Sequence, residues 1–162
     1  MSRVLILLAL CFLPAIVNAA RPVHPVKNPF VVVGKVFCDT CRCGFETSAT
    51  TYIHGAQVRV ECKDRNTLNV VYHADGVTDA TGTYRITVAD DHEEELCEST
   101  LVSSPQTDCT AKTPGRDRSR VILTNNNGII SNIRNANAMG FMKDSALSGC
   151  TQLLKQYQEY DE

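Results

Sequence analysis

Residues 34–47, GKVFCDTCRCGFET, hold three cysteines within six positions, Cys38, Cys41 and Cys43. Such a cluster is typical of a metal site, a redox motif or the anchor points of a disulfide framework. The compartment decides among these, because cysteines stay reduced in the cytosol and form bridges in the secretory pathway. The N-terminus of the chain therefore helps to decide among these three roles, because a secretion signal would lie there.

The first 20 residues, MSRVLILLALCFLPAIVNAA, predict a secretory signal peptide, because one early cation precedes an apolar run and then small residues. The apolar run, Val4 to Leu13, is shorter than the roughly 20 residues of a membrane-spanning helix. We place the cleavage after Ala19, so that residues 1–19 are the signal peptide. The prediction is a secreted, extracellular protein without membrane insertion.

The remaining chain of about 143 residues has the length of one domain. It carries 15 basic and 18 acidic side chains and no basic patch, which argues against nucleic acid as a partner. Residues 20–29 include three prolines and show no periodicity, so we expect an extended leader there. The folded domain is predicted to span residues 30–162.

Short β-rich segments run through this domain. In GAQVRVEC (55–62), apolar and polar residues alternate, which predicts a half-buried strand. Similar segments separated by turn-rich pieces occur at 30–37, 68–73, 83–88, 96–102, 120–124 and 128–133. About seven strands predict an all-β fold, a small antiparallel sandwich or barrel.

The C-terminal tail has a different pattern. From Asp144 to Tyr157, apolar residues recur at steps of three and four, which predicts a C-terminal helix. Asp144 or Ser145 is expected to cap its start. Cys150 lies on the apolar face, so we expect it to pin the helix to the sheet.

The cysteines favour a structural role. A zinc site at Cys38, Cys41 and Cys43 lacks a fourth ligand at a suitable spacing, and no helical segment follows the CDTC motif, as a thioredoxin-like site requires. Disulfide bridges remain, and we expect no metal or cofactor. The spacing leaves the pairing open. Seven cysteines leave one unpaired, and Cys41 and Cys43 compete for one partner.

The stretch GKVFCDTCR resembles the signature of the Ole e I-like family of plant pollen proteins, and GAQVRVEC, GVTDATGTYRITV, DHEEELC and LVSSPQTDC follow in the family's order. The resemblance implies three disulfides: Cys38–Cys109, Cys41–Cys150 and Cys62–Cys97. Cys43 then falls outside the family pattern. It is expected to be a protected free thiol in a monomer, or alternatively the link of a disulfide dimer.

The resemblance also implies a function. It indicates a non-enzymatic protein of the pollen wall or apoplast, active in pollen hydration, germination and tube growth, with a receptor-like kinase ectodomain as partner and allergenicity in several members. Independently of the family, no GxSxG motif or triad spacing indicates an enzyme. The alternative is a cell-wall or polysaccharide-associated module, which the lack of tryptophan disfavours.

Two loops are the predicted partner-binding surfaces, because binding residues concentrate on loops of a rigid scaffold. One is the acidic turn 90–95, interpreted as a solvated hairpin turn that includes His92. The other is the loop 110–118. The predicted binding residues are Asp90, Asp91, Glu93, Glu94, Glu95, Arg116 and Arg118.

Overall fold

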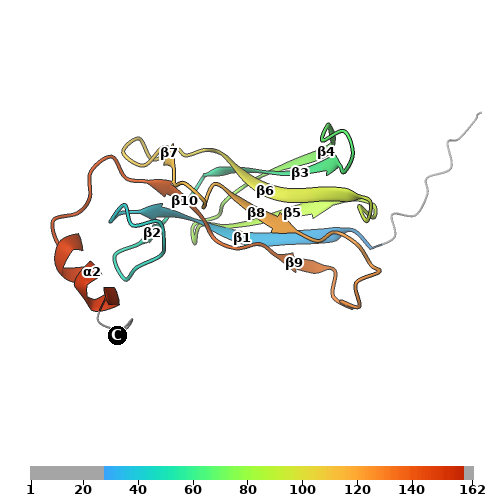
Figure 1. Cartoon of the computed structure of the whole chain (residues 1–162). Coiled ribbons are helices and arrows are strands. Elements are labelled where there is room, and N and C mark those ends of the chain that lie inside the picture. The colour runs from blue at the N-terminus through green and yellow to red at the C-terminus, as the bar shows by residue number, and fades with distance from the viewer. Residues whose placement is uncertain (1–27, 159–162) are drawn as a thin grey trace, which may run out of the picture.

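The computed structural model describes residues 28–158. The predicted signal peptide (1–19) lies outside the described residues, and so does the predicted leader apart from residues 28 and 29. The described chain forms two facing β-sheets, with one helix beyond their end (Figure 1). The all-β fold with a C-terminal helix is confirmed.

Ten strands occur within the described range. The first sheet contains β1 (Phe30–Asp39), β2 (Thr51–Tyr52), β5 (Thr83–Val88), β7 (Ala111–Lys112), β9 (Ile133–Asn135) and β10 (Met139–Met142). The second has the order β4 (Val70–Val77), β3 (Gln57–Asp64), β6 (Glu95–Ser103) and β8 (Arg118–Val121). The count exceeds the predicted seven because β2, β7 and β10 were not predicted: β2 and β7 have two residues each and β10 has four, too few for a clear sequence pattern.

The alternation predicted for residues 55–62 is confirmed in β3. In β3, Val58, Val60 and Cys62 are fully buried, whereas the intervening side chains face outward. Strand β5 behaves in the same way and buries every second residue. Both sheets contribute to one continuous core, because each turns its apolar face toward the other. Its largest members are Phe30, Tyr84, Leu101, Leu123, Met139 and Phe141.

Strand β1 is the centre of the first sheet. It pairs antiparallel with β5 and β2, and parallel with β9 and β10. The sheet is therefore mixed, whereas the sequence predicted antiparallel pairing. The sequence cannot reveal the difference, since alternation specifies which face is buried and not the direction of the neighbouring strand.

The strand predicted at 128–133 is wrong, since β9 begins only at Ile133. The preceding loop is organised by the buried side chain of Arg134. Its guanidinium donates hydrogen bonds to the carbonyl oxygens of Ile122 and Thr124, each at 2.9 Å, and lies 4.7 Å from the centre of the Phe30 ring. These contacts hold the segment after β8 against β9. Within the predicted strand, the backbone N–H of Ile129 donates to Oδ1 of Asn127 and is not available to a neighbouring strand.

The helix α2 (Cys150–Gln158) begins six residues after the predicted start at Asp144. The predicted cap at Asp144 or Ser145 is therefore wrong. The backbone N–H groups of Asp144 and Leu147 donate instead to the carbonyl oxygens of Asp108 and Thr40. These two contacts tie residues 144–147 to the segments around Asp108 and Thr40, and the helix begins after them.

The turn before β5 is fixed by Asp79. One oxygen of its carboxylate accepts hydrogen bonds from the backbone N–H groups of Thr81 and Thr83 and from the Thr81 hydroxyl. Gly82, with φ of 71°, supplies the left-handed residue that closes the turn. The hydrogen bonds from Thr81 and Thr83 lower the pKa of Asp79.

This pKa predicts how Asp79 contributes to stability. A carboxyl with a lowered pKa stabilises the fold above its unfolded pKa of about 3.9, and its contribution is lost as the pH falls through the lowered value. We expect Asp79→Asn to be less stable than the natural chain by a constant amount above about pH 5, and the gap to shrink below about pH 4. Urea unfolding across this pH range measures the gap. Parallel stability curves down to the lowest pH would contradict the assignment.

Candidate functional site

The signature segment forms a loop built around Asp39, which ends β1 and is buried. Its carboxylate accepts hydrogen bonds from the backbone N–H groups of Cys43, at 3.1 Å, and Gly44, at 2.7 Å. Arg42 and Gly44 have positive φ angles of 56° and 85°, so the chain reverses tightly here. The three clustered cysteines accordingly have different fates: Cys38 and Cys41 are bridged to different segments, and Cys43 is free.

Three disulfides hold the described domain together: Cys38–Cys109, Cys41–Cys150 and Cys62–Cys97. These are the pairs that the family resemblance implies. The first joins β1 to the segment before β7, the second joins the signature loop to the start of α2, and the third crosses from β3 to β6. In α2 only Cys150 is buried, so the bridge is its main anchor, and an edge-to-face contact of Tyr157 with Phe45, with ring centres 5.4 Å apart, adds to it.

Among the described cysteines, Cys43 alone is free, and its side chain is half-buried. Its sulfur lies 3.4 Å from the carbonyl oxygen of Phe45 and 3.6 Å from a carboxylate oxygen of Asp39. Burial raises the pKa of the Cys43 thiol, and the nearby Asp39 charge raises it further. The reactive thiolate is therefore scarcer than in an ordinary cysteine at neutral pH.

We expect the native, unreduced protein to take up one equivalent of iodoacetamide slowly, and the denatured, unreduced protein to take up one equivalent rapidly. The reason is that unfolding removes both the burial and the proximity of Asp39. Mass spectrometry over time gives the two rates and the modified residue. Equal rates in the two states, or no alkylation of a monomer, would contradict the protected thiol.

The acidic turn joins β5 to β6 at the end of the sheets opposite α2 (Figure 1). Two of its carboxylates hold the neighbouring loop: Asp91 accepts the backbone N–H of Asn125 at 2.9 Å, and Glu93 accepts the side-chain amide of Asn126 at 2.6 Å. Partial burial acts to raise the pKa of Asp91, but the hydrogen bonds from Asn125 and Thr124 outweigh it and lower the pKa. The turn borders a hollow of about 580 Å³.

The remaining carboxylates of the turn divide into two groups. Asp90 and Glu94 are exposed and make no side-chain hydrogen bond or ion pair with residues 28–158. Glu95 is half-buried and bound to His92. The predicted acidic surface therefore consists of two unengaged carboxylates beside two that organise its backbone.

The interpretation of the whole turn as solvated is wrong for His92, which is 7% exposed. Its Nδ1 lies 2.7 Å from Oε2 of Glu95, and its Nε2 lies 2.9 Å from the carbonyl oxygen of Ala89. The ring is held between two acceptors, at a ring-centre distance of 4.7 Å from Tyr72. His92 is thus part of the structure beneath the turn and not of its surface.

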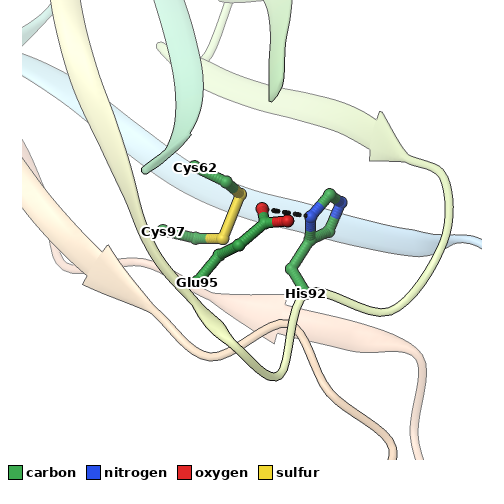
Figure 2. Close-up of side chains that lie close together, drawn as sticks. All are labelled: Cys62, His92, Glu95 and Cys97. Carbon is green, nitrogen blue, oxygen red and sulfur yellow. Dashed lines mark hydrogen bonds and ion pairs between the residues drawn. A yellow bond between two sulfur atoms is a disulfide. The ribbon is translucent and has the colours of Figure 1, made fainter. Parts of the chain in front are cut away.

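The pair of His92 and Glu95 lies against the Cys62–Cys97 disulfide (Figure 2). The potential ligand atoms of these four residues all lie within 4.8 Å of one another. Sequence reasoning missed this cluster because Cys62 comes from another strand. The sequence signal was the spacing of His92, Glu95 and Cys97, which the turn and the start of β6 bring together.

The basic residues of the second predicted surface lie at the other end of the molecule. Arg116 donates from Nε to the carbonyl oxygen of Gly44 at 3.0 Å, so it supports the signature loop. Arg118 is exposed and forms ion pairs with Asp117 at 3.1 Å and Glu98 at 3.6 Å. Since Arg118 pairs in register with Thr100, about five residues along β6 from the acidic turn, roughly 17 Å separates the surfaces.

These features define an all-β domain stapled by disulfides, in which the unengaged carboxylates of Asp90 and Glu94 lie on the acidic turn and the two predicted arginines are engaged by other groups. No helix in the described part of the chain has the length and apolar character needed to cross a membrane.

The family model described as pollen protein Ole e 1 like matches residues 28–158. The chain is 46% identical over 157 residues to a pollen-specific protein of Zea mays, covering 97% of this chain and 91% of that protein. It is 40% identical over 155 residues to an anther-specific protein of Solanum lycopersicum, covering 95% and 94%. The crystal structure of the plantain pollen allergen Pla l 1 matches with a TM-score of 0.68 at 32% identity, covering 75% of this chain and 99% of that one. The chain belongs to the Ole e 1-like pollen protein family, and the predicted resemblance is confirmed.

Proposed function

We propose that this protein is a secreted, non-enzymatic extracellular protein of pollen or anther that acts by binding an extracellular protein partner. The family assignment supports the tissue, because its relatives include pollen- and anther-specific proteins and pollen allergens. The three disulfides fit an oxidising compartment. Allergenicity and a place in the apoplast or pollen wall belong to the same proposal.

The partner is a receptor-like kinase ectodomain, and the binding supports pollen hydration, germination and tube growth. The observation that carries the binding surface is the acidic turn, where Asp90 and Glu94 are exposed without a partner in residues 28–158 while Asp91 and Glu93 fix the backbone beneath them. A rigid loop with unpaired charges loses little conformational entropy on binding. Its chemistry suits a cationic patch on the partner.

The test variant is Asp90→Asn combined with Glu94→Lys. Asparagine is chosen at position 90 because the backbone φ is 65°, a left-handed conformation that asparagine tolerates. We expect the affinity for the receptor-like kinase ectodomain that binds the natural chain to fall by about tenfold, mainly through slower association at low salt. Stability should change by less than about 0.5 kcal/mol, since both side chains are on the surface. Surface plasmon resonance on a panel of pollen receptor-like kinase ectodomains measures the affinity.

The matched control is Asp144→Lys, an exposed charge reversal near the α2 end of the molecule, which should leave the affinity unchanged. Full affinity in the test variant would exclude the acidic turn and direct attention to Arg116 and Arg118. Absence of binding across the panel, together with retention on pectin or cellulose, would favour the polysaccharide-associated alternative.

A further inference from the structure

The cluster of Cys62, His92, Glu95 and Cys97 consists of four side chains whose types bind metal ions. In the oxidised chain the two sulfurs are bonded to each other and neither is a thiolate, so the cluster cannot bind a metal ion. We propose that these four side chains form a tetrahedral zinc site when the Cys62–Cys97 disulfide is reduced. This inference goes beyond partner binding and does not depend on it.

The donor set fits zinc. Two thiolates, one imidazole nitrogen and one carboxylate oxygen give four donors, the usual number in a structural zinc site. Zinc–ligand bonds of about 2.0–2.3 Å at tetrahedral angles place the donor atoms roughly 3.3–3.8 Å apart. The four donors already lie within 4.8 Å of one another. Their approach to zinc therefore needs side-chain rotation and no rearrangement of the strands.

The backbone presents both sulfurs from adjacent positions. Cys62 in β3 and Cys97 in β6 are register partners with a Cα–Cα distance of 4.0 Å, so their side chains leave the same face of the sheet. Breaking the sulfur–sulfur bond leaves both thiols directed at His92 and Glu95 (Figure 2). The ladder between β3 and β6 holds the two cysteines in place without the bridge.

The histidine is oriented as a zinc ligand would be. Histidines that bind metals usually donate the other ring N–H to a carbonyl or carboxylate, which fixes the tautomer. Nε2 of His92 lies 2.9 Å from the carbonyl oxygen of Ala89, and Nδ1 faces Glu95 Oε2 at 2.7 Å. A zinc ion would lie between Nδ1 and the carboxylate, where a proton now joins them.

The surroundings supply room and charge balance. A cavity of about 170 Å³ is lined by Cys97, His92 and Glu95, and so borders three of the four donors. Zinc with two thiolates and one carboxylate has a net charge of −1. Arg65 and Arg120 line the same cavity and offer the compensating positive charge.

The disulfide opens by a two-electron reduction. A dithiol reductant donates two electrons and two protons to the disulfide, giving two protein thiols and the oxidised, disulfide form of the reductant. Zinc binding then releases three protons to water, two from the thiols and the one shared by His92 Nδ1 and Glu95 Oε2. Strands β3 and β6 are thus cross-linked in both states, by sulfur–sulfur bonding when oxidised and by the metal when reduced.

The experiment uses the full mature chain carrying Cys43→Ser, which removes the free thiol. The chain is reduced with a phosphine, freed of reductant without oxygen and titrated with Co²⁺. We expect one equivalent to give the visible bands of tetrahedral, thiolate-bound cobalt, and Zn²⁺ to displace it. The oxidised chain should give no such bands. Zinc should also protect Cys62 and Cys97, and not Cys38, Cys41, Cys109 or Cys150, from alkylation mapped by mass spectrometry.

His92→Asn should weaken cobalt binding by more than about 100-fold, beyond the usual loss for a residue that only orients a ligand. The matched control, His73→Asn, changes an exposed histidine on β4 and should leave the titration unchanged. Cobalt bands that persist in His92→Asn, or zinc protection of the other four cysteines instead, would overturn the proposal. The protection pattern is read on the chain with His92 intact, so the result stands even if His92→Asn fails to fold.

Discussion

Replacing both Cys38 and Cys109 by alanine is expected to lower the free energy of unfolding by about 4 kcal/mol. The bridge closes a loop over a sequence separation of 71 residues, and its removal gives the unfolded chain the entropy of that loop. Both cysteines are completely buried, so the two alanines also leave a small cavity in the core. Urea unfolding of the oxidised protein, followed by circular dichroism, measures the change.

The matched control is Cys43→Ala, which removes a half-buried sulfur without opening a bridge. It should change stability by less than about 1 kcal/mol. Comparable losses for the control and for the double variant would show that lost sulfur packing, rather than the cross-link, carries the effect.

Gly34→Ala is expected to destabilise the fold by about 3 kcal/mol, the upper part of the range for overpacked cores. A Cβ atom at Gly34 would lie 2.4 Å from the hydroxyl oxygen of Tyr84 and 2.6 Å from the ring carbon that bears it. Tyr84 is Gly34's register partner on β5 and is fully buried, so its ring cannot move aside without disturbing both sheets. The midpoint of urea unfolding reports the loss.

Two further variants isolate this contact. Gly149→Ala is the matched control, because a Cβ atom there meets no atom within 4 Å and its φ is not in the left-handed region; we expect no loss of stability. Gly34→Ala should cost much less in a Tyr84→Leu background, since the smaller side chain vacates the space. An undiminished cost in that background would contradict the steric explanation.

Local pattern predicted the strands well where one face is buried and one is solvated. Residues 55–62 and 83–88 alternate in the sequence and in the structure, because each position follows the pleat. The same reasoning failed at residues 128–133, where the side chain of Asn127 accepts the backbone N–H of Ile129 in a local turn. It also failed at Asp144, since residues 144–147 are tied to Asp108 and Thr40 and the helix begins only at Cys150.

The candidate sites were predictable to a smaller extent. The acidic turn could be found as a run of charges, yet the separate roles of Asp90 and Asp91 depend on Asn125, which is more than 30 residues away. The burial of His92 depends on Tyr72 and on the disulfide behind it. Spacing alone left the disulfide pairing open, because cysteine partners are brought together by the sheets and not by the nearby sequence.

The position of β1 has a consequence for biosynthesis. The parallel partner of Val36 is Met139, which the ribosome adds more than 100 residues later. During translation the most central strand of the first sheet therefore emerges early and keeps an open hydrogen-bonding edge until nearly the whole domain has been made. Nascent chains halted before β10 present that edge to one another and are the species that a chaperone must shield from aggregation.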